Sequence, residues 1–369
     1  MISISKTPIP TPAEAGQAFP QGGRGENINT EQLSHRGEAR VLRNSPMGDF
    51  SEEARLSRNL SPRGGKQERR VNYKKETGKG GLKYIAMQKA YFNGKFLQKE
   101  RVKISPDDRG FLFADGIYEV VRWYEGFFFD MESHVERMKR SMKEIRISWA
   151  EADSFPSIAR ELIKKNKLQE RHSLVYLQVT RGASKRTHAF PSPPVEPTVY
   201  AYAWGFKPAK ELIAAGIKTI LRNDPRWNRC DIKSVSLLPN ILSFQEATEA
   251  GSMECIFIRD GMMTECAHSN VFFVIDGKIF THPESENILS GVTRKNVIRI
   301  ARKAGISVFE IPVAASRMNE VSEAFITNTS FEVAPVISID NKPVGNGAPG
   351  PVTKLLREKF DAEIMALKG

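Results

Sequence analysis

The sequence predicts an α/β protein with two folded domains, preceded by a disordered segment. The chain has 369 residues, of which 40% are hydrophobic and 27% are charged, and this composition is typical of globular proteins large enough for two domains. Beyond about residue 86, segments with the two-residue alternation of strands occur among segments with the spacing of amphipathic helices. Residues 1–86 show neither period.

Residues 1–86 are the predicted disordered extension. They are rich in Gly, Pro, Ser, Arg and Glu and contain four aromatic residues, so they offer little apolar surface to bury. They hold 15 Lys and Arg against 9 Asp and Glu, which makes the extension basic. We interpret it as dispensable and Met87 as the start of the structured part. A targeting or nucleic-acid-tethering arm is the alternative.

The net charge of +12 raises the question of nucleic acid binding. Half of the excess lies in residues 1–86, because residues 87–369 carry 40 Lys and Arg against 34 Asp and Glu. No stripe of basic residues alternates with aromatic ones, so nucleic acid is not an expected partner. A basic nucleic-acid-binding protein that uses the extension remains the alternative from a different class.

The sequence gives no sign of a membrane span, a secretion signal or a metal site. No run approaches the roughly 18 apolar residues that a membrane span needs, and no apolar signal segment opens the chain. The spacing of Cys230, Cys255 and Cys266 fits no metal site and leaves one cysteine unpaired in any disulfide scheme. These features favour a reducing compartment, which we take to be the cytoplasm.

Residues 87–205 are expected to form the smaller, N-terminal α/β domain. A hairpin is predicted around Asn93-Gly94, since this dipeptide suits a type I′ turn. Ser133 is the expected cap of a helix, with Glu136 completing a capping box. Apolar spacing predicts strands at 116–124, 173–180 and 198–204 and helices at 135–145 and 155–167. Residues 205–208 are the expected linker.

Two groups in this half are candidates for binding anions. Arg137 lies near the start of the first helix, where a phosphate is favoured, although a surface or ion-paired arginine is the alternative. Residues 181–188 form a glycine-containing loop with three cations and a histidine. Arginine forks in such a loop suit a carboxylate, and solvated loop charge is the alternative.

Residues 209–369 are expected to form the larger, C-terminal domain. Pro239 suits the first turn of a helix, and this helix should end before Gly251. A second helix should end at Gly305. Apolar patterns predict strands at 218–221, 255–258, 271–275 and 325–328.

Three features of this half suggest a reactive site. Lys233 ends a polar segment at the expected edge of a core, where partial burial and nearby cations would lower the pKa of its amine and let it form an imine with a carbonyl; an ordinary surface lysine is the alternative. Glu265 in a strand-rich region needs a partner, either a protonated pyridine nitrogen or a Lys or Arg. Small residues at 290–293 and hydroxyls at 327–330 suit a phosphate.

Taken together, six motifs give the chain a resemblance to a known family. Over about residues 88–365 it resembles the class IV aminotransferases, which are fold-type IV enzymes that use pyridoxal 5′-phosphate, and most closely their bacterial branch that acts on D-amino acids. The motifs are Asp108-Arg109-Gly110, Gly116-Ile117-Tyr118-Glu119-Val120-Val121, His134-Val135-Glu136-Arg137, Gln178-Val179-Thr180-Arg181-Gly182, Arg186-Thr187-His188 and Cys230-Asp231-Ile232-Lys233-Ser234.

The resemblance implies a role for each candidate residue and places the cofactor at the interface of the two domains. Lys233 would bind the cofactor covalently and move the substrate proton, and Glu265 would pair with the pyridine nitrogen. The phosphate would be held by Arg137, Val292, Thr293 and Thr329. The substrate carboxylate would be held by Tyr118, Arg186 and His188, the last two from the partner subunit of a homodimer.

The resemblance also implies the reaction and its alternatives. The expected substrates are a D-amino acid such as D-alanine and a 2-oxo acid, 2-oxoglutarate or pyruvate. Alternatives in the same fold are a branched-chain L-aminotransferase, an aminodeoxychorismate lyase and an R-selective amine transaminase, and the trio of Tyr118, Arg186 and His188 counts against all three. His268 and Phe331 depart from the family's small polar residues, which leaves the side-chain preference open.

Overall fold

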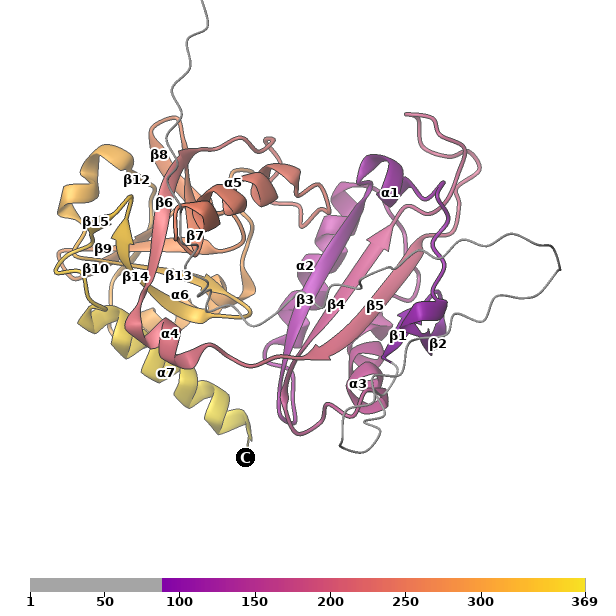
Figure 1. The fold of residues 1–369 in the computed structure, drawn as a ribbon, viewed down its shortest axis with the longest axis horizontal. Coiled ribbons are helices and arrows are strands. Elements are labelled where there is room, and N and C mark those ends of the chain that lie inside the picture. The colour runs from indigo at the N-terminus through magenta and orange to yellow at the C-terminus, as the bar shows by residue number, and fades with distance from the viewer. Residues whose placement is uncertain (1–87, 369) are drawn as a thin grey trace, which may run out of the picture. The chain divides into compact units, whose positions relative to one another are not determined.

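The computed structural model describes residues 88–368, which contain two β-sheets with helices packed against them (Figure 1). This confirms the predicted α/β class. The prediction of disorder concerns residues 1–86, which lie outside the described residues, as does the proposed start at Met87.

The first sheet has five strands, all antiparallel, in the order β2-β1-β5-β4-β3. Its strands are β1 (Lys89–Phe92), β2 (Lys95–Gln98), β3 (Gly116–Tyr124), β4 (His172–Thr180) and β5 (Thr198–Gly205). The hairpin between β1 and β2 turns at Asn93-Gly94 with φ of 41° and 82°, as the dipeptide predicts. The strand ranges agree with the alternation read from the sequence.

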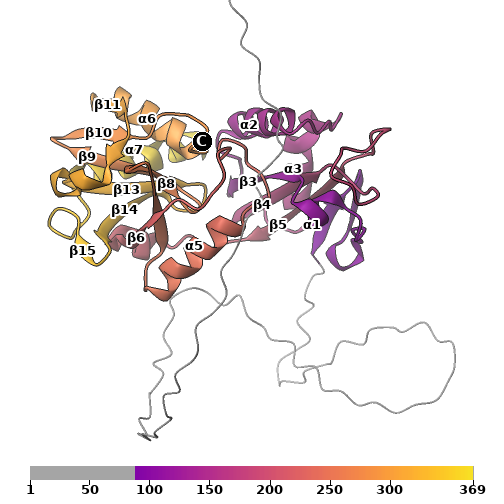
Figure 2. The ribbon, with the colours of Figure 1, turned by 90° about the horizontal axis from the view of Figure 1, so that it is seen from above.

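The helices of this half are α1 (Arg109–Phe113), α2 (Met131–Glu144) and α3 (Phe155–Lys165). Figure 2 shows α2 and α3 on the same side of the sheet. Their apolar residues pack on the inward side chains of β3, β4 and β5, and Met138, Phe155 and Leu162 are fully buried in this core. The opposite face of the sheet carries half-buried tyrosines, among them Tyr118 and Tyr176, whose ring centroids lie 5.9 Å apart.

The predicted cap of α2 is wrong. The helix begins at Met131, and its N-cap is Asp130, whose carboxylate accepts a hydrogen bond from the backbone N–H of Ser133 at 3.3 Å. Asp130 and Ser133 both suit an N-cap by residue type. In the structure the cap is Asp130, whose backbone is left-handed with φ of 49°, and Ser133 lies inside the first turn as the donor.

The second sheet has ten strands, nine of them in the order β11-β10-β9-β13-β14-β6-β7-β8-β12, with β15 paired to β14. Its strands are β6 (Ile217–Asn223), β7 (Glu254–Arg259), β8 (Met262–Cys266), β9 (Asn270–Ile275), β10 (Lys278–Thr281), β11 (Val308–Glu310), β12 (Val313–Ala314), β13 (Glu323–Asn328), β14 (Glu332–Ile339) and β15 (Lys342–Pro343). Three neighbouring pairs, β10–β11, β14–β6 and β6–β7, are parallel and the rest are antiparallel.

The helices of this half are α4 (Lys210–Ala215), α5 (Leu238–Glu249), α6 (Val292–Lys303) and α7 (Pro351–Lys368). Three short 3-10 helices complete the described chain: η1 (Lys99–Arg101), η2 (Ala152–Ser154) and η3 (Ala315–Glu320). The start of α5 agrees with the predicted position of Pro239 in its first turn, and the starts of α5 and α6 both contribute to the cavity described next.

Candidate active site

A cavity brings together seven of the nine residues that the sequence singles out. It is bordered by β3, the middle of α2, the segment 226–237, β8, the start of α6 and the turn between β13 and β14. The predicted residues that line it are Tyr118, Arg137, Lys233, Glu265, Val292, Thr293 and Thr329. Arg186 and His188 do not line it.

Lys233 is held in the cavity by its own backbone. Its carbonyl accepts a hydrogen bond from the N–H of Tyr118 at 3.0 Å, and its N–H donates to the hydroxyl of Ser141 at 3.2 Å. The next residue, Ser234, forms an isolated bridge with Ile117 of β3. The half-buried side chain then extends over Tyr118, with Nζ 4.3 Å from the ring centroid. The backbone of Lys233 is therefore fixed, and its side-chain amine makes no hydrogen bond or ion pair within residues 88–368.

Arg137 is both a cavity residue and an ion-pair partner. Its Nε and Nη2 donate to the two carboxylate oxygens of Glu119 at 2.7 and 2.8 Å, and its Nη1 donates to the carbonyl of Ser290 at 3.1 Å. His134, one helical turn earlier, contacts the same carboxylate at 2.9 Å. The guanidinium keeps two further N–H groups for an anion in the cavity.

Glu119 is the partner that the sequence reasoning did not assign. It has no exposed surface, and burial raises the pKa of its carboxyl, but the charge and hydrogen bonds of Arg137 and His134 outweigh this and hold the pKa well below its usual range. The signal was present in the strand pattern, since Glu119 shares the inward face of β3 with Ile117 and Val121. A carboxylate on a buried face requires a cation.

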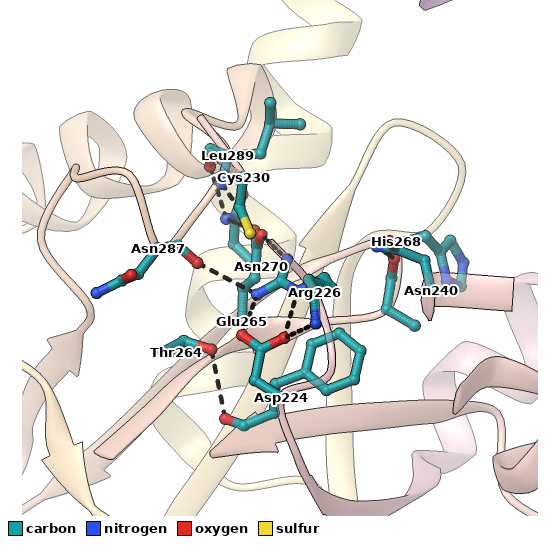
Figure 3. Close-up of polar contacts among 12 residues, drawn as sticks. Asp224, Arg226, Cys230, Asn240, Thr264, Glu265, His268, Asn270, Asn287 and Leu289 are labelled. Carbon is teal, nitrogen blue, oxygen red and sulfur yellow. Dashed lines mark hydrogen bonds and ion pairs between the residues drawn. The ribbon is translucent and has the colours of Figure 1, made fainter. Parts of the chain in front are cut away.

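Glu265 lies in a buried ion-pair cluster (Figure 3). Its carboxylate pairs with the guanidinium of Arg226 and accepts hydrogen bonds from Asn270 Nδ2 and from the N–H of Leu289, each at 3.0 Å. Arg226 also pairs with Asp224 at 2.8 Å. Burial lowers the pKa of Arg226, but the two carboxylates outweigh it and raise the pKa, so the arginine stays charged. The ion-paired alternative for Glu265 is therefore present in this structure, with Arg226 as the cation.

The start of α6 offers donors to an anion. The N-cap Gly291 supplies no side chain, so the first backbone N–H groups of the helix, at Val292 and Thr293, have no capping partner from that residue. On the facing turn, Thr329 lines the cavity, and Thr327 Oγ1 is buried without a hydrogen-bond partner among residues 88–368. A helix start with nearby hydroxyls and Arg137 suits a phosphate group.

These residues fit pyridoxal 5′-phosphate as a set. The phosphate requires several donors, and Arg137, the start of α6 and the hydroxyls of Thr293 and Thr329 could hold it. The pyridine nitrogen requires a carboxylate, for which Glu265 is the candidate, and the aldehyde requires an amine, for which Lys233 is the candidate. All of these groups line one cavity.

Arg186 and His188 lie on an exposed loop away from this cavity. The guanidinium carbon of Arg186 is 5.1 Å from the ring centroid of Phe113, and the ring centroid of His188 is 5.6 Å from the same ring. Both side chains therefore flank α1. Within one chain, Arg186 and His188 do not reach the cavity of Lys233. That they reach the cavity of a partner subunit stays a prediction.

The loop that carries Arg186 is anchored by a buried ion cluster. Asp115 pairs with Arg109 at 2.8 Å and with Arg181 at 2.7 Å, and Arg109 Nη1 donates to the carbonyl of Thr187 at 2.6 Å. Burial raises the pKa of Asp115, but the hydrogen bonds and charges of the two arginines outweigh it and lower the pKa. The arginines of the motifs at 109 and 181 thus hold the loop in place.

Two further properties of the described residues bear on the sequence-based expectations. Within residues 88–368, no group of three or more His, Cys, Asp and Glu side chains is arranged to hold a metal ion. None of the described helices has the length and apolar character needed to cross a membrane. Cys230, Cys255 and Cys266 are buried and free.

Comparisons with known proteins agree on one family. The profile of the family described as Amino-transferase class IV matches residues 116–339. The D-alanine aminotransferase of Staphylococcus haemolyticus is 38% identical over 279 residues, which cover 75% of this chain and 98% of that protein. The D-alanine aminotransferase of Bacillus licheniformis is 40% identical over 281 residues, again 75% of this chain and 98% of that protein.

Solved structures share the fold. The branched-chain amino acid aminotransferase of Escherichia coli superimposes with a TM-score of 0.70 at 26% identity, covering 75% of this chain and 94% of that one. A second branched-chain amino acid aminotransferase, from T.th. and solved with pyridoxamine 5′-phosphate, has a TM-score of 0.68 at 28% identity, with the same coverage of 75% and 94%.

Proposed function

Because the chain belongs to the class IV aminotransferases, we propose that it transfers amino groups between D-amino acids and 2-oxo acids with pyridoxal 5′-phosphate as cofactor. The observation that carries this function is that Lys233, Arg137, Glu265 and the start of α6 line one and the same cavity. The D-alanine aminotransferases, at 38% and 40% identity, favour D-amino acids such as D-alanine as donors. The acceptor is 2-oxoglutarate or pyruvate, giving D-glutamate or D-alanine.

Each cavity residue then has a task. Lys233 would hold the cofactor through its amine, and the same amine, when free, would act as the base that takes the proton from the substrate α-carbon and as the acid that gives it back. When bound, the cofactor's pyridine ring accepts the electron pair left on that carbon. Glu265 would pair with the ring nitrogen; burial raises the pKa of its carboxyl, and the charge and hydrogen bond of Arg226 oppose this rise.

The phosphate is held on the opposite side of the cavity. Arg137 supplies charge and two N–H groups, while Val292 supplies a backbone N–H. Thr293 and Thr329 supply hydroxyls. Glu119 acts through Arg137, because its bidentate ion pair fixes the plane of the guanidinium.

We assign the substrate carboxylate to Tyr118 of the same chain and to Arg186 and His188 of a second copy. The support is an exposed apolar face on α5, where Leu238, Ile241 and Leu242 are 66%, 61% and 57% exposed. The neighbouring residues Leu237 and Asn240 line the cavity. A second copy that covers this face is therefore beside the cavity mouth, and a homodimer is the proposed active form.

The proposed division into domains follows the two sheets, with the smaller domain at 87–205 and the larger at 209–369. The buried free thiols of Cys230, Cys255 and Cys266 are compatible with the proposed location in the cytoplasm. The proposed partners are small molecules and a second copy of the chain, without nucleic acid or membrane.

The test uses purified protein loaded with pyridoxal 5′-phosphate. With 2-oxoglutarate as acceptor, D-alanine should give pyruvate and D-glutamate, L-alanine should not, and Lys233→Ala should abolish turnover. The solved branched-chain relatives favour an L-specific enzyme as the second candidate. Turnover of L-leucine or L-valine without turnover of D-alanine would establish that candidate instead.

A further inference from the structure

His268 lines the cavity and is not used by the reaction described above. It follows β8, in the short connection to β9, and its side chain is 44% exposed. Figure 3 shows it beside Asn240, away from the cluster around Arg226. Its position is therefore separate from the contacts that hold Glu265.

A buried carboxylate fixes one nitrogen of this histidine. His268 Nδ1 lies 2.6 Å from Oε2 of Glu254, which has no exposed surface. The same carboxylate accepts hydrogen bonds from the N–H groups of Cys255 and Ala267, at 3.0 and 3.1 Å, and from the hydroxyl of Ser269 at 2.9 Å. Glu254 is thus surrounded by donors, and Nδ1 of His268 is placed to donate to its Oε2.

The protonation of the second nitrogen follows from the surrounding charges. The titratable groups that act on His268 are Glu254 and Lys233. Partial burial lowers the pKa of the imidazole and Lys233 lowers it further, but the charge and hydrogen bond of Glu254 outweigh both and raise the pKa. The ring is therefore an imidazolium over a wider pH range than a free histidine.

Neighbouring side chains fix the direction of the ring. The rings of Phe244 and Phe331 meet it edge to face, with centroids at 5.0 and 6.1 Å. Phe331 is itself placed by Asn328, whose Oδ1 accepts its backbone N–H at 2.7 Å. Nε2 of His268 makes no hydrogen bond to any residue of the described chain, so it remains available to a ligand in the cavity.

The other cationic side chains of the cavity already have an ion-pair partner or a proposed role in the reaction. Four cationic side chains line it: Arg137, Arg226, Lys233 and His268. Arg137 is paired with Glu119 and faces the start of α6, Arg226 is paired with Glu265, and Lys233 is the reactive amine. His268 is thus the cation left to recognise a negative charge on the substrate itself.

We propose that His268, held by Glu254, binds the side-chain carboxylate of acidic substrates and makes the enzyme prefer dicarboxylic 2-oxo acids and their D-amino acids over neutral ones of equal length. This inference rests on the proposed function and names the substrate class of that site. It also gives a role to a residue that differs from the small polar ones of the family. The bulky ring recognises a substrate group instead of merely narrowing the cavity.

The test compares two acceptors that differ only in the second carboxylate. With D-alanine as donor, 2-oxoglutarate and 2-oxovalerate have the same carbon chain, and D-alanine consumption is followed by chromatography. His268→Gln keeps a polar side chain without charge, so it should lower kcat/KM for 2-oxoglutarate about tenfold or more and leave 2-oxovalerate within about twofold, because a hydrogen bond to a charged group is lost. An equal loss for both acceptors would mean a structural role and would overturn the inference.

A binding measurement gives a second readout that does not depend on turnover. Calorimetric titration of the cofactor-loaded enzyme with glutarate and with valerate should show that His268→Gln weakens glutarate binding about tenfold and leaves valerate unchanged. Glutarate binding that is unaffected by the substitution contradicts the inference. Wild-type activity with D-alanine and 2-oxovalerate tests the proposed function separately, since 2-oxovalerate has no second carboxylate for His268 to bind.

Discussion

Replacing Glu119 by Gln removes the charge that balances the buried Arg137 while keeping the size of the side chain. The carboxylate of Glu119 makes three short contacts, two to Arg137 at 2.7 and 2.8 Å and one to His134 at 2.9 Å. Removing one partner of a buried ion pair costs about 3–5 kcal/mol, because the other charge stays buried. We therefore expect Glu119→Gln to lower the free energy of unfolding of the cofactor-free protein by about this amount at neutral pH.

The cofactor should reduce this loss. A phosphate beside Arg137 supplies negative charge in place of the missing carboxylate, so the destabilisation should be smaller in the loaded enzyme than in the cofactor-free one. Urea denaturation of both forms, at one fixed protein concentration, measures the two differences. Glu161→Gln, which breaks the exposed pair with Lys165, is the matched control and should change neither form measurably.

The pH dependence of this effect has a defined sign. The pKa of Glu119 is depressed in the folded protein, so its contribution to stability is fully present above the unfolded pKa of about 4.3 and is lost as the pH falls below it. The difference between wild type and Glu119→Gln should therefore be largest near neutral pH and shrink in acid. A difference that is equally large in both forms and at all pH values would refute the argument that Glu119 acts through Arg137.

Three further predictions concern the substrate and the extension. Arg186→Ala should raise the KM for D-alanine about tenfold or more and leave the cofactor absorbance intact, and an unchanged KM would remove Arg186 from the carboxylate site. The preference for 2-oxoglutarate over 2-oxovalerate should be present at low pH and lost as the pH rises through the raised pKa of His268, which a pH series of kcat/KM measures. A chain that starts at Met87 should keep full activity and the same melting temperature, and a large loss of either would give residues 1–86 a role.

Local patterns predicted the elements whose residues show a clear period. β3, β4 and β5 were read from alternation, and α5 from Pro239 at its start and Gly251 after its end. Helix α7 was not predicted. The apolar residues 127–129 form no strand and make only an isolated bridge, between Trp123 and Phe128, because the chain turns into α2 directly after it.

The sequence predicted which residues form the site, but not which side chains they contact. Two of the motifs contain Lys233 and Arg137, Glu265 was identified as a carboxylate in a strand-rich region, and the fold brings the three residues to one cavity. Their ion-pair partners are distant in the chain, as with Glu265 and Arg226, which are 39 residues apart. Periodicity carries no information on such pairs, since they depend on how β8 and the segment after β6 meet.

Residues in or next to strand β3 contact both the groups proposed to bind the cofactor and the loop proposed to bind the substrate. Asp115, just before the strand, anchors the loop of Arg186, while Tyr118 lies under Lys233 and Glu119 orients Arg137. In the proposed homodimer, each β3 would therefore serve its own cofactor through Tyr118 and Glu119 and its partner's substrate through Asp115. A small shift of this strand would then disturb two active sites at once. The activity of both subunits would therefore depend on the rigidity of one strand.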